Sequence, residues 1–320
     1  MDDSVDELRS DRRARGDRVL VCNPASGSAD HAAEIRDRGR ERGFTVRETQ
    51  AAGDARQLAR EAAVDGSSLV AVAGGDGTVN EAVHGLLEAN ALERVDLAVI
   101  PTGTANLFAR QFGLTDVDRA FDALDAGSKA RIDVGLADGR PFVNTCLVGL
   151  SAEANTETPD ALKRRLGAFA YVLTTLRHIP EYDGLPLSVT VNGDAAAGET
   201  AETWQGNALL VLVGNAFRLP SLTNRGGRSA TDGLLEVTIL EENGRFEGLD
   251  RFDRESLSRL LDRESAPITR FETPSLTITA CDAEPLPFSL DGESVSATEL
   301  ELSVREQCLS LYVDAERGPL

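Results

Sequence analysis

Lysine is nearly absent from this chain of 320 residues, in which Lys129 and Lys163 are the only two. Acidic residues outnumber basic ones by 53 to 33, so the net charge is -20. A surface of this sign repels a phosphate backbone, which argues against a nucleic-acid binder. An acidic, lysine-poor chain with 5% aromatic residues is typical of proteins adapted to high intracellular salt. We therefore attribute the acidity to adaptation to high salt rather than to the charge of the substrate.

Paired cysteines and long apolar runs are also missing. The longest apolar run, 208–213, is far shorter than the ~20 residues of a membrane-spanning helix. Residues 1–17 are charged, lack the apolar stretch of a signal peptide, and are expected to form a disordered tail. We therefore expect a cytoplasmic protein, at most peripheral at a membrane. No Cys-x-x-Cys motif occurs, which predicts reduced, buried thiols at Cys22, Cys146, Cys281 and Cys308.

Strand and helix patterns alternate over residues 18–131. This alternation predicts an α/β domain in which helices cover both faces of a parallel sheet. Ligands bind outside the carboxyl ends of the strands in such sheets. The expected strands are 19–22, 44–49, 69–73 and 97–100, and the expected helices are 30–42, 54–64, 78–92 and 104–112.

Strand patterns dominate the remainder of the chain, with two expected helices at 162–178 and 256–263. This composition predicts a β-rich, sandwich-like second domain over 132–304. We expect 305–320 to return to the first domain. The expected strands are 132–136, 141–148, 187–191, 208–213, 235–240, 275–280 and 300–304.

A glycine-rich turn follows the buried strand pattern at 69–73 and leads into a helix pattern. Glycines at such a turn let backbone N–H groups approach an anion, and the helix N-terminus favours phosphate there. A purely structural interpretation is a capping box formed by Thr78 and Glu81. The turn reads Gly74-Gly75-Asp76-Gly77-Thr78-Val79-Asn80-Glu81.

Two further turns follow neighbouring strand patterns, and the three together indicate a shared anion site at one sheet edge. No Gly-x-x-x-x-Gly-Lys-Ser/Thr motif occurs, so the site is not a standard P-loop. Phosphates would instead be held by backbone amides, the hydroxyls of Thr78 and Thr104, and a metal ion. The two turns are Asn23-Pro24-Ala25-Ser26-Gly27 and Pro101-Thr102-Gly103-Thr104-Ala105-Asn106.

These motifs together resemble the diacylglycerol kinase catalytic domain and its sphingosine kinase relatives. The Gly74 turn resembles the family signature, and the turns at Asn23 and Pro101 resemble its first and third nucleotide loops. Thr49 matches a family threonine near the nucleotide. The similarity runs from about Arg18 to Val313. Further segments in the family's order are Leu162–Gly167, Tyr171–Val172, Val213–Asn215, Asp232–Val237 and Asp291–Glu293.

The resemblance implies a diacylglycerol kinase-like fold and an ATP- and Mg²⁺-dependent kinase that phosphorylates a lipid hydroxyl. Asp291 and Glu293 match the catalytic carboxylates, and either could be the base. Asp76 and Asp133 would organise one Mg²⁺, and Asp232 would belong to a second site. The implied nucleotide-binding residues are Asn23, Pro24, Ser26, Gly27, Thr49, Gly74, Gly75, Asp76, Gly77, Thr78, Glu81, Gly103, Thr104 and Asn106.

Two other functions are compatible with the motifs. An NAD kinase shares the Gly-Gly-Asp-Gly turn and the two-domain plan, but the Pro101 turn resembles the lipid kinases instead. A nucleotide- or lipid-binding regulator on an inactive kinase scaffold is the other alternative. Leu107 keeps it open, because many lipid kinases of this type have aspartate there. The expected partner is a lipid, presented at a membrane surface, and a homodimer is compatible with the sequence.

Overall fold

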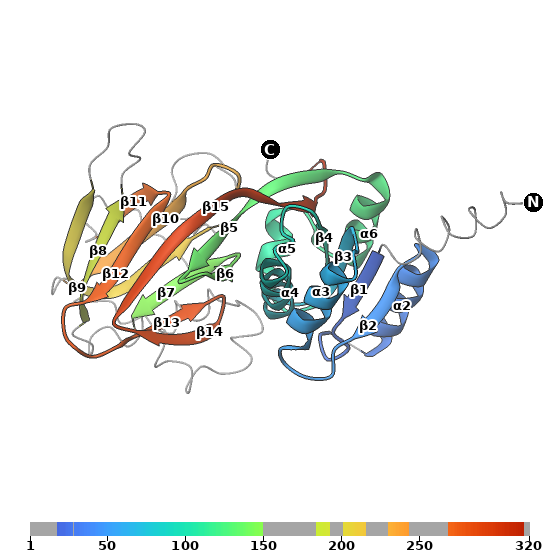
Figure 1. Cartoon of the computed structure of the whole chain (residues 1–320), viewed down its shortest axis with the longest axis horizontal. Helices are drawn as coiled ribbons and strands as arrows, with labels where there is room; N and C mark the ends of the chain where they lie inside the picture. The colour runs from blue at the N-terminus through green and yellow to red at the C-terminus, as the bar shows by residue number, and fades with distance from the viewer. Residues whose placement is uncertain are drawn as a thin grey trace, which may run out of the picture. The chain divides into compact units, whose positions relative to one another are not determined.

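The computed structural model describes residues 18–27, 29–149, 184–192, 201–215, 230–242 and 268–316. They form two compact units (Figure 1). The first unit contains the described residues up to Ile132 and those from Gln307 onward, and the second contains those of Asp133–Glu306. Two strands, β5 (Lys129–Ala137) and β15 (Glu299–Tyr312), contribute residues to both units. The predicted helices 162–178 and 256–263 lie outside the described residues.

The first unit is built on a parallel sheet with the strand order β4-β3-β1-β2. Leu311 of β15 pairs in parallel with Leu97 of β4. The strands are β1 (Arg18–Cys22), β2 (Thr45–Glu48), β3 (Leu69–Gly74) and β4 (Asp96–Pro101). The helices are α2 (Ala29–Glu41), α3 (Asp54–Val64), α4 (Asp76–Glu88), α5 (Leu107–Gln111) and α6 (Val117–Ala126).

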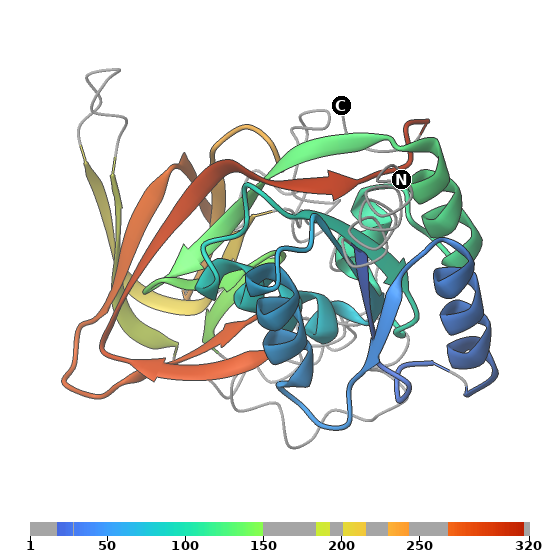
Figure 2. The ribbon, with the colours of Figure 1, turned by 45° about the vertical axis from the view of Figure 1, so that its right-hand side comes forward.

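Helices cover both faces of this sheet, as Figure 2 shows. Alternate residues of β1 and β3, such as Leu20 and Ala71, pack with Ile35 of α2 and Phe121 of α6. Helices α3 and α4 pack on the opposite face against β1 and β3. The chain therefore leaves β1 for one face and the adjacent β3 for the other. This divergence is the topological switch point at which open α/β sheets bind ligands.

Helices α3 and α4 approach each other unusually closely at Gly85. A Cβ atom placed on Gly85 would lie 2.1 Å from the backbone oxygen of Arg56. On the α3 side, the buried residues are small, namely Ala55, Ala59, Ala62 and Ala63. The two helices are therefore in near backbone contact, with no room for a further methyl group.

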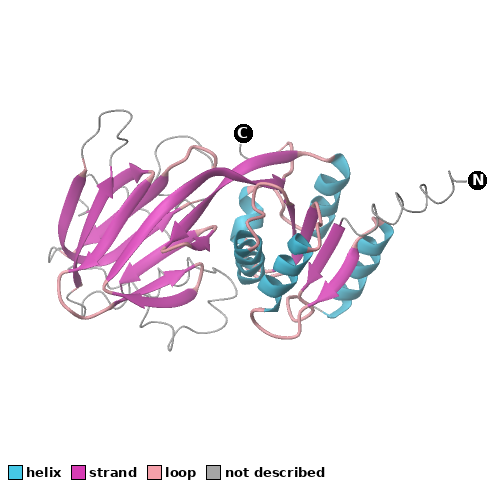
Figure 3. Cartoon of the chain, viewed as in Figure 1, coloured by secondary structure: helices cyan, strands magenta, loops and turns pink. Residues whose placement is uncertain are grey.

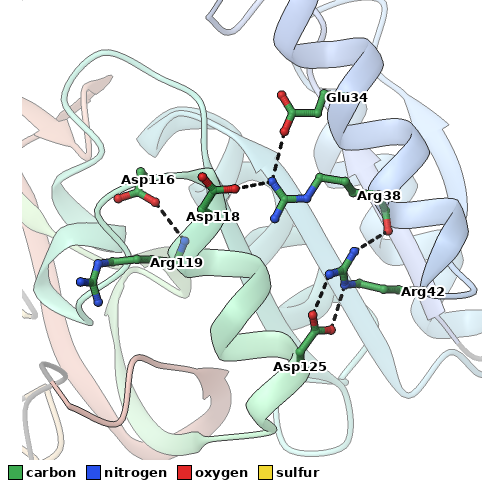
Figure 4. Close-up of polar contacts among 7 residues, drawn as sticks. All are labelled: Glu34, Arg38, Arg42, Asp116, Asp118, Arg119 and Asp125. Atoms are coloured by element: carbon green, nitrogen blue, oxygen red, sulfur yellow. Dashed lines mark hydrogen bonds and ion pairs between the residues drawn. The ribbon is translucent and has the colours of Figure 1, made fainter.

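Arg38 of α2 and Arg42, the residue that follows this helix, hold α6 in place (Figure 4). Arg38 bonds Asp118 at 2.6 Å, and Arg42 bonds both carboxylate oxygens of Asp125 at 2.8 and 2.6 Å. The guanidinium carbons lie 4.2 and 4.7 Å from the ring centroid of Phe121. The hydrogen bonds from Arg42 lower the pKa of Asp125. Arg38 and Arg42 thus each form an ion pair with an aspartate of α6 and a cation–π contact with Phe121.

The second unit consists of antiparallel strands, and every helix in the described part of the chain lies in the first unit (Figure 3). One strand path runs β14-β13-β7-β9-β8-β12-β15, and β10 pairs with both β9 and β11. Phe142, Val211 and Phe288 lie in its buried core. The strands are β6 (Arg140–Phe142), β7 (Thr145–Gly149), β8 (Leu185–Asn192), β9 (Glu202–Gly214), β10 (Leu235–Glu241), β11 (Ile268–Thr273), β12 (Ser275–Ala280), β13 (Leu286–Leu290) and β14 (Glu293–Ala297).

The predicted fold class, a parallel α/β region followed by a β-rich region, is confirmed, but several element bounds were wrong. Helix α4 begins at Asp76 rather than Thr78, and α5 is shorter than the predicted helix 104–112. The predicted strand 141–148 is interrupted at Val143–Asn144. Helix α6 was not predicted, although Asp116 is a typical N-cap and accepts a hydrogen bond from the Arg119 N–H at 2.9 Å.

Among the described residues, no helix is both long enough and apolar enough to cross a membrane.

Thiol chemistry provides a first prediction. Cys22, Cys146 and Cys308 are buried as predicted, but the prediction was wrong for Cys281, which is exposed. Burial raises the pKa of Cys22 and, with the nearby charge of Asp291, that of Cys146, so these thiols stay protonated and unreactive at pH 8. A chromogenic disulfide reagent at pH 8 should therefore titrate one thiol in the folded protein and four in denaturant.

The control for this titration is Cys281→Ser, which should show no rapidly reacting thiol. Rapid reaction of a second thiol in the folded protein would contradict the burial of these side chains.

Candidate functional site

Three strand-end loops of the first unit are fastened together at the switch point. The Asn23 side chain, after β1, donates from Nδ2 to Oγ1 of Thr78 at 3.0 Å. The Asn23 backbone N–H bonds the Ala73 carbonyl at 2.8 Å. After β4, the Thr102 N–H bonds the Gly74 carbonyl at 3.0 Å. The predicted turns are thus brought together at one edge of the sheet.

Glycines let these loops touch without side chains between them. A Cβ atom on Gly103 would lie 2.5 Å from the Gly75 Cα, and one on Gly27 would lie 2.8 Å from the Thr102 carbonyl oxygen. Gly27 also has a φ of +88°, a conformation that L-residues rarely adopt. The loop edge is therefore lined by backbone, as an anion site requires. Pro24, Ser26, Gly77 and Thr104 are partly or fully exposed on these loops.

The predicted capping box of Thr78 and Glu81 was wrong. Helix α4 has Gly75 as its N-cap and no side-chain cap. Thr78 contacts Asn23 instead, and Glu81 accepts the N–H groups of Gly53 and Ala55 at 3.0 and 3.2 Å. Glu81 therefore fastens the start of α3 to α4.

The segment that precedes α3 lies beside the first loop. The Thr49 N–H bonds the Cys22 carbonyl at 2.9 Å, which places Thr49 next to the end of β1. Asp54 accepts the N–H groups of Gln50 and Ala51, and these hydrogen bonds lower its pKa. A fourth chain segment therefore joins the three loops.

Polar atoms in the third loop lack partners. Asn106 adopts a left-handed conformation, with a φ of +48°, and its Nδ2 bonds the Gly103 carbonyl at 2.8 Å. Its Oδ1 and the Oγ1 of Thr102 are buried without a hydrogen-bond partner among the described residues. Buried polar atoms are rarely left unpaired, so both atoms are available to a bound group.

Asp76 stands at the start of α4, where the loop meets α5. Its Oδ1 accepts the Phe108 N–H at 2.9 Å, and Leu107 is the first residue of α5. Within the described ranges, no group of three or more His, Cys, Asp or Glu side chains could enclose a metal ion. Such sparse ligation fits only an ion that keeps most of its waters, as Mg²⁺ does.

The two predicted metal-ligating aspartates of the second unit differ in their exposure to solvent. Asp133 is 1% exposed, and its Oδ2 accepts the Gly233 N–H at 2.8 Å. Asp232 is exposed, and its Oδ1 accepts the Leu234 N–H at 3.2 Å. Asp133 therefore supports the turn, while Asp232 is an exposed residue.

Asp291 and Glu293 lie on the two-residue hairpin that joins β13 to β14. Asp291 and Gly292 have φ angles of +48° and +99°, as expected for an Asp-Gly hairpin turn. The Asp291 Oδ2 accepts the Val143 N–H at 2.6 Å, and its Oδ1 accepts those of Asn144 and Thr145 at 2.9 and 2.8 Å. Glu293 is exposed at the start of β14. The two carboxylates thus have very different surroundings.

Two groups of residues that bond to Asp291 or Asp133 were absent from the predicted site. One is the bend Val143–Thr145, and the other is Asn215, whose Nδ2 donates to the carbonyls of Asp133 and Val143. A signal was available, because Asn144 interrupts an apolar run and Asn215 ends one. Asn23, which was predicted, stands in the same kind of position after β1.

Each of the two units matches a known family model. Residues 17–137 match the family model described as the diacylglycerol kinase catalytic domain, and residues 144–313 match the YegS C-terminal NAD kinase beta sandwich-like domain. A diacylglycerol kinase of Bacillus subtilis is 32% identical over 72% of this chain and 74% of its own length. A protein of Pseudomonas aeruginosa named probable lipid kinase YegS-like is 31% identical over 93% of each chain.

Solved structures show the same fold. A crystal structure of a diacylglycerol kinase from Bacillus anthracis strain Sterne superposes with a TM-score of 0.68 at 21% identity. It covers 94% of this chain, and the match covers 98% of the other.

Proposed function

Because the chain belongs to the diacylglycerol kinase family, whose members are phosphotransferases with an alcohol acceptor, we propose that it uses ATP to phosphorylate the hydroxyl of a diacylglycerol-like lipid. One observation carries this proposal. Three strand-end loops join at the switch point, where glycines bring their backbones into close contact. Phosphoryl transfer requires such a cradle, because it depends mainly on positioning and charge stabilisation.

We assign the ATP phosphates to the loops of the first unit. The backbone at Gly75, Gly77 and Gly103 and the hydroxyls of Thr78 and Thr104 are the candidate donors. The unpartnered oxygens of Asn106 and Thr102 would accept hydrogen bonds from the nucleotide or from ordered water.

Magnesium fits this assignment as a water-rich ion. The hydrogen bond to Phe108 uses only one carboxylate oxygen of Asp76, and Asp232 is an exposed carboxylate of the second unit. Asp133 would act by supporting its turn. Bound Mg²⁺ neutralises charge on the transferring phosphoryl group, and the chain's own residues orient the phosphates and the acceptor.

Of the two hairpin carboxylates, we propose Glu293 as the base for the acceptor hydroxyl. Protonating Asp291 would weaken hydrogen bonds from three backbone N–H groups. Glu293 has no side-chain hydrogen bond within the described residues and is open to solvent. A carboxylate with free lone pairs can accept a proton, whereas Asp291 is suited to hold the hairpin that carries Glu293.

The direct test is incubation of the purified protein with labelled ATP, Mg²⁺ and either a total lipid extract or diacylglycerol in vesicles, at low and molar salt. A labelled phospholipid supports the proposal. Labelled NADP formed from added NAD, with no labelled lipid, would instead identify an NAD kinase. Nucleotide binding without transfer to any acceptor would contradict catalysis.

The donor loops make a separate prediction. Asn23→Asp keeps the acceptor of the Ala25 N–H but places a negative charge against Thr78, beside the assigned phosphates. We expect ATP affinity to fall by about tenfold, since like charges at a few ångströms cost on the order of 1 kcal/mol or more. Isothermal titration calorimetry with ATP and Mg²⁺ measures this change.

The matched control is Asn90→Asp, which makes the same chemical change at an exposed residue that also has a positive φ. Equal losses of affinity in both variants would argue against phosphates at the Asn23 loop.

A further inference from the structure

The short bend between β6 and β7 in the second unit is held from two sides by polar side chains, one buried and one partly buried. Asn215, at the end of β9, is 7% exposed and lies on one side of the bend. The carboxylate of Asp291 lies on the other. The same two peptide groups, Val143–Asn144 and Asn144–Thr145, bond to both residues.

Asn215 holds the carbonyl ends of these peptide groups. Its backbone N–H bonds the Asn144 carbonyl at 2.9 Å, and its Nδ2 bonds the Val143 carbonyl at 3.3 Å. Nδ2 also bonds the Asp133 carbonyl at 3.1 Å. One residue therefore joins the end of β9 to β5 and to the bend.

Asp291 holds the N–H ends of the same groups. The Asn144 and Thr145 N–H groups bond its Oδ1 at 2.9 and 2.8 Å. Because a trans peptide is planar, its C=O and N–H point in opposite directions, and fixing one end orients the other. Hydrogen bonds at both ends of one amide also polarise each other. Asn215 therefore sets the direction of the donors that hold Asp291.

We propose that Asn215 is a positioning residue for the reaction, acting through the bend on Asp291 and on Glu293 two residues further along. This inference rests on the proposed function, in which Glu293 is the base. Asn215 itself touches no reacting atom. Its contribution is to keep the Asp291–Gly292 turn in one orientation, so that Glu293 meets the acceptor hydroxyl in a constant position.

The chemistry of the Asn215 amide supports this role. Two carbonyl acceptors require the Nδ2 donors to face the bend, which fixes the amide orientation. The Oδ1 is then buried with no donor among the described residues. An unpaired buried acceptor costs about 1–3 kcal/mol, so asparagine is not the residue that stability alone would favour here.

The test compares Asn215→Asp with Asn192→Asp. Asn215→Asp is nearly isosteric but replaces two N–H donors by an oxygen that repels the Asp133 and Val143 carbonyls. Asn192→Asp makes the same change at the exposed end of β8, where Nδ2 bonds only the Ser275 hydroxyl at 3.1 Å among the described residues. If Asn215→Asp does not fold, Asn215→Ser, which keeps one donor, replaces it.

Two measurements are expected to change together. Hydrogen exchange at the Asn144 and Thr145 amides should accelerate at least about tenfold in Asn215→Asp and stay at the wild-type rate in Asn192→Asp. At saturating lipid, kcat should fall about 10- to 100-fold while the KM for ATP stays unchanged, because only positioning in the second unit is disturbed. In combination with Asp291→Asn, the losses in kcat should not multiply, since both changes act on the same peptide groups.

Protected amides in Asn215→Asp, unchanged kcat despite rapid exchange, or losses that multiply with Asp291→Asn would each overturn the proposal. A wild-type protein without lipid kinase activity would instead overturn the proposed function. The hydrogen-exchange comparison remains readable in that case, because it measures the bend itself.

Discussion

Glu293→Gln is expected to lower the rate of lipid phosphorylation by about 10²–10⁴-fold, the usual contribution of a general base. The substitution preserves the size of the side chain and removes its ability to take the hydroxyl proton. Glu293 is exposed at the start of an edge strand, so stability should not change. Steady-state kinetics at saturating ATP and lipid, with calorimetric titration of ATP, separate the loss of kcat from nucleotide binding.

Glu301→Gln is the matched control, because Glu301 is an exposed carboxylate on β15 in the same unit. Asp291→Asn gives the contrast: an amide NH₂ would face backbone donors, so both stability and kcat should fall. If Glu293→Gln retains wild-type kcat, Glu293 is not the base. If only Asp291→Asn is inactive and its stability is unchanged, the assignment of the two carboxylates must be reversed.

The second large effect is expected in the core of the first unit. Gly85→Ala should lower the free energy of unfolding by about 3 kcal/mol, because the new methyl group would lie 2.1 Å from the Arg56 carbonyl oxygen and force α3 away from α4. The positions of the new Cβ atom and of the Arg56 carbonyl are both fixed by the backbone, so no side-chain rotation can relieve the clash. Denaturant unfolding monitored by circular dichroism measures the loss.

The same helix contains the control for this experiment. Gly77 is also in α4, but a Cβ atom there would meet nothing within 4 Å. Gly77→Ala should therefore leave stability unchanged or raise it by up to about 1 kcal/mol, since alanine has the higher helix propensity. Gly77 lies in the assigned phosphate loop, so its ATP affinity is measured separately. Equal destabilisation of both variants would show that helix propensity, rather than the close approach, governs α4.

The gathering of the three strand-end loops was predictable because its information is local. A buried strand, a glycine turn and a helix pattern follow one another at Leu69–Glu88, and the same order recurs around Asn23 and Pro101. Parallel sheets place all such turns at one edge, so topology alone brings them together. The similarity of their order to a known family then supplied the function.

Other parts depend on contacts between distant residues, which local patterns do not contain. Thr78 and Glu81 satisfy the capping-box pattern, yet neither side chain caps α4. Thr78 accepts a hydrogen bond from Asn23, 55 residues away, and Glu81 accepts one from Gly53 at the start of α3. Apart from Asn144, residues 141–148 have the pattern of one continuous strand, and the hydrogen bond that breaks it at Val143 comes from Asp291, 148 residues further on. Helix α6 was missed although Asp116 caps it.

The first unit is assembled from both ends of the chain. Leu311 pairs beside β4, the Val313 N–H bonds the Ser128 carbonyl at 3.0 Å, and Asp314 forms an ion pair with Arg119 at 2.8 Å. During synthesis, β4 therefore emerges from the ribosome long before the strand that covers its edge. The nascent first unit must wait, with an open sheet edge, until the whole second unit has been translated. Premature termination before Gln307 would thus leave the edge of β4 uncovered and remove the partners of Ser128 and Arg119 in a unit translated long before.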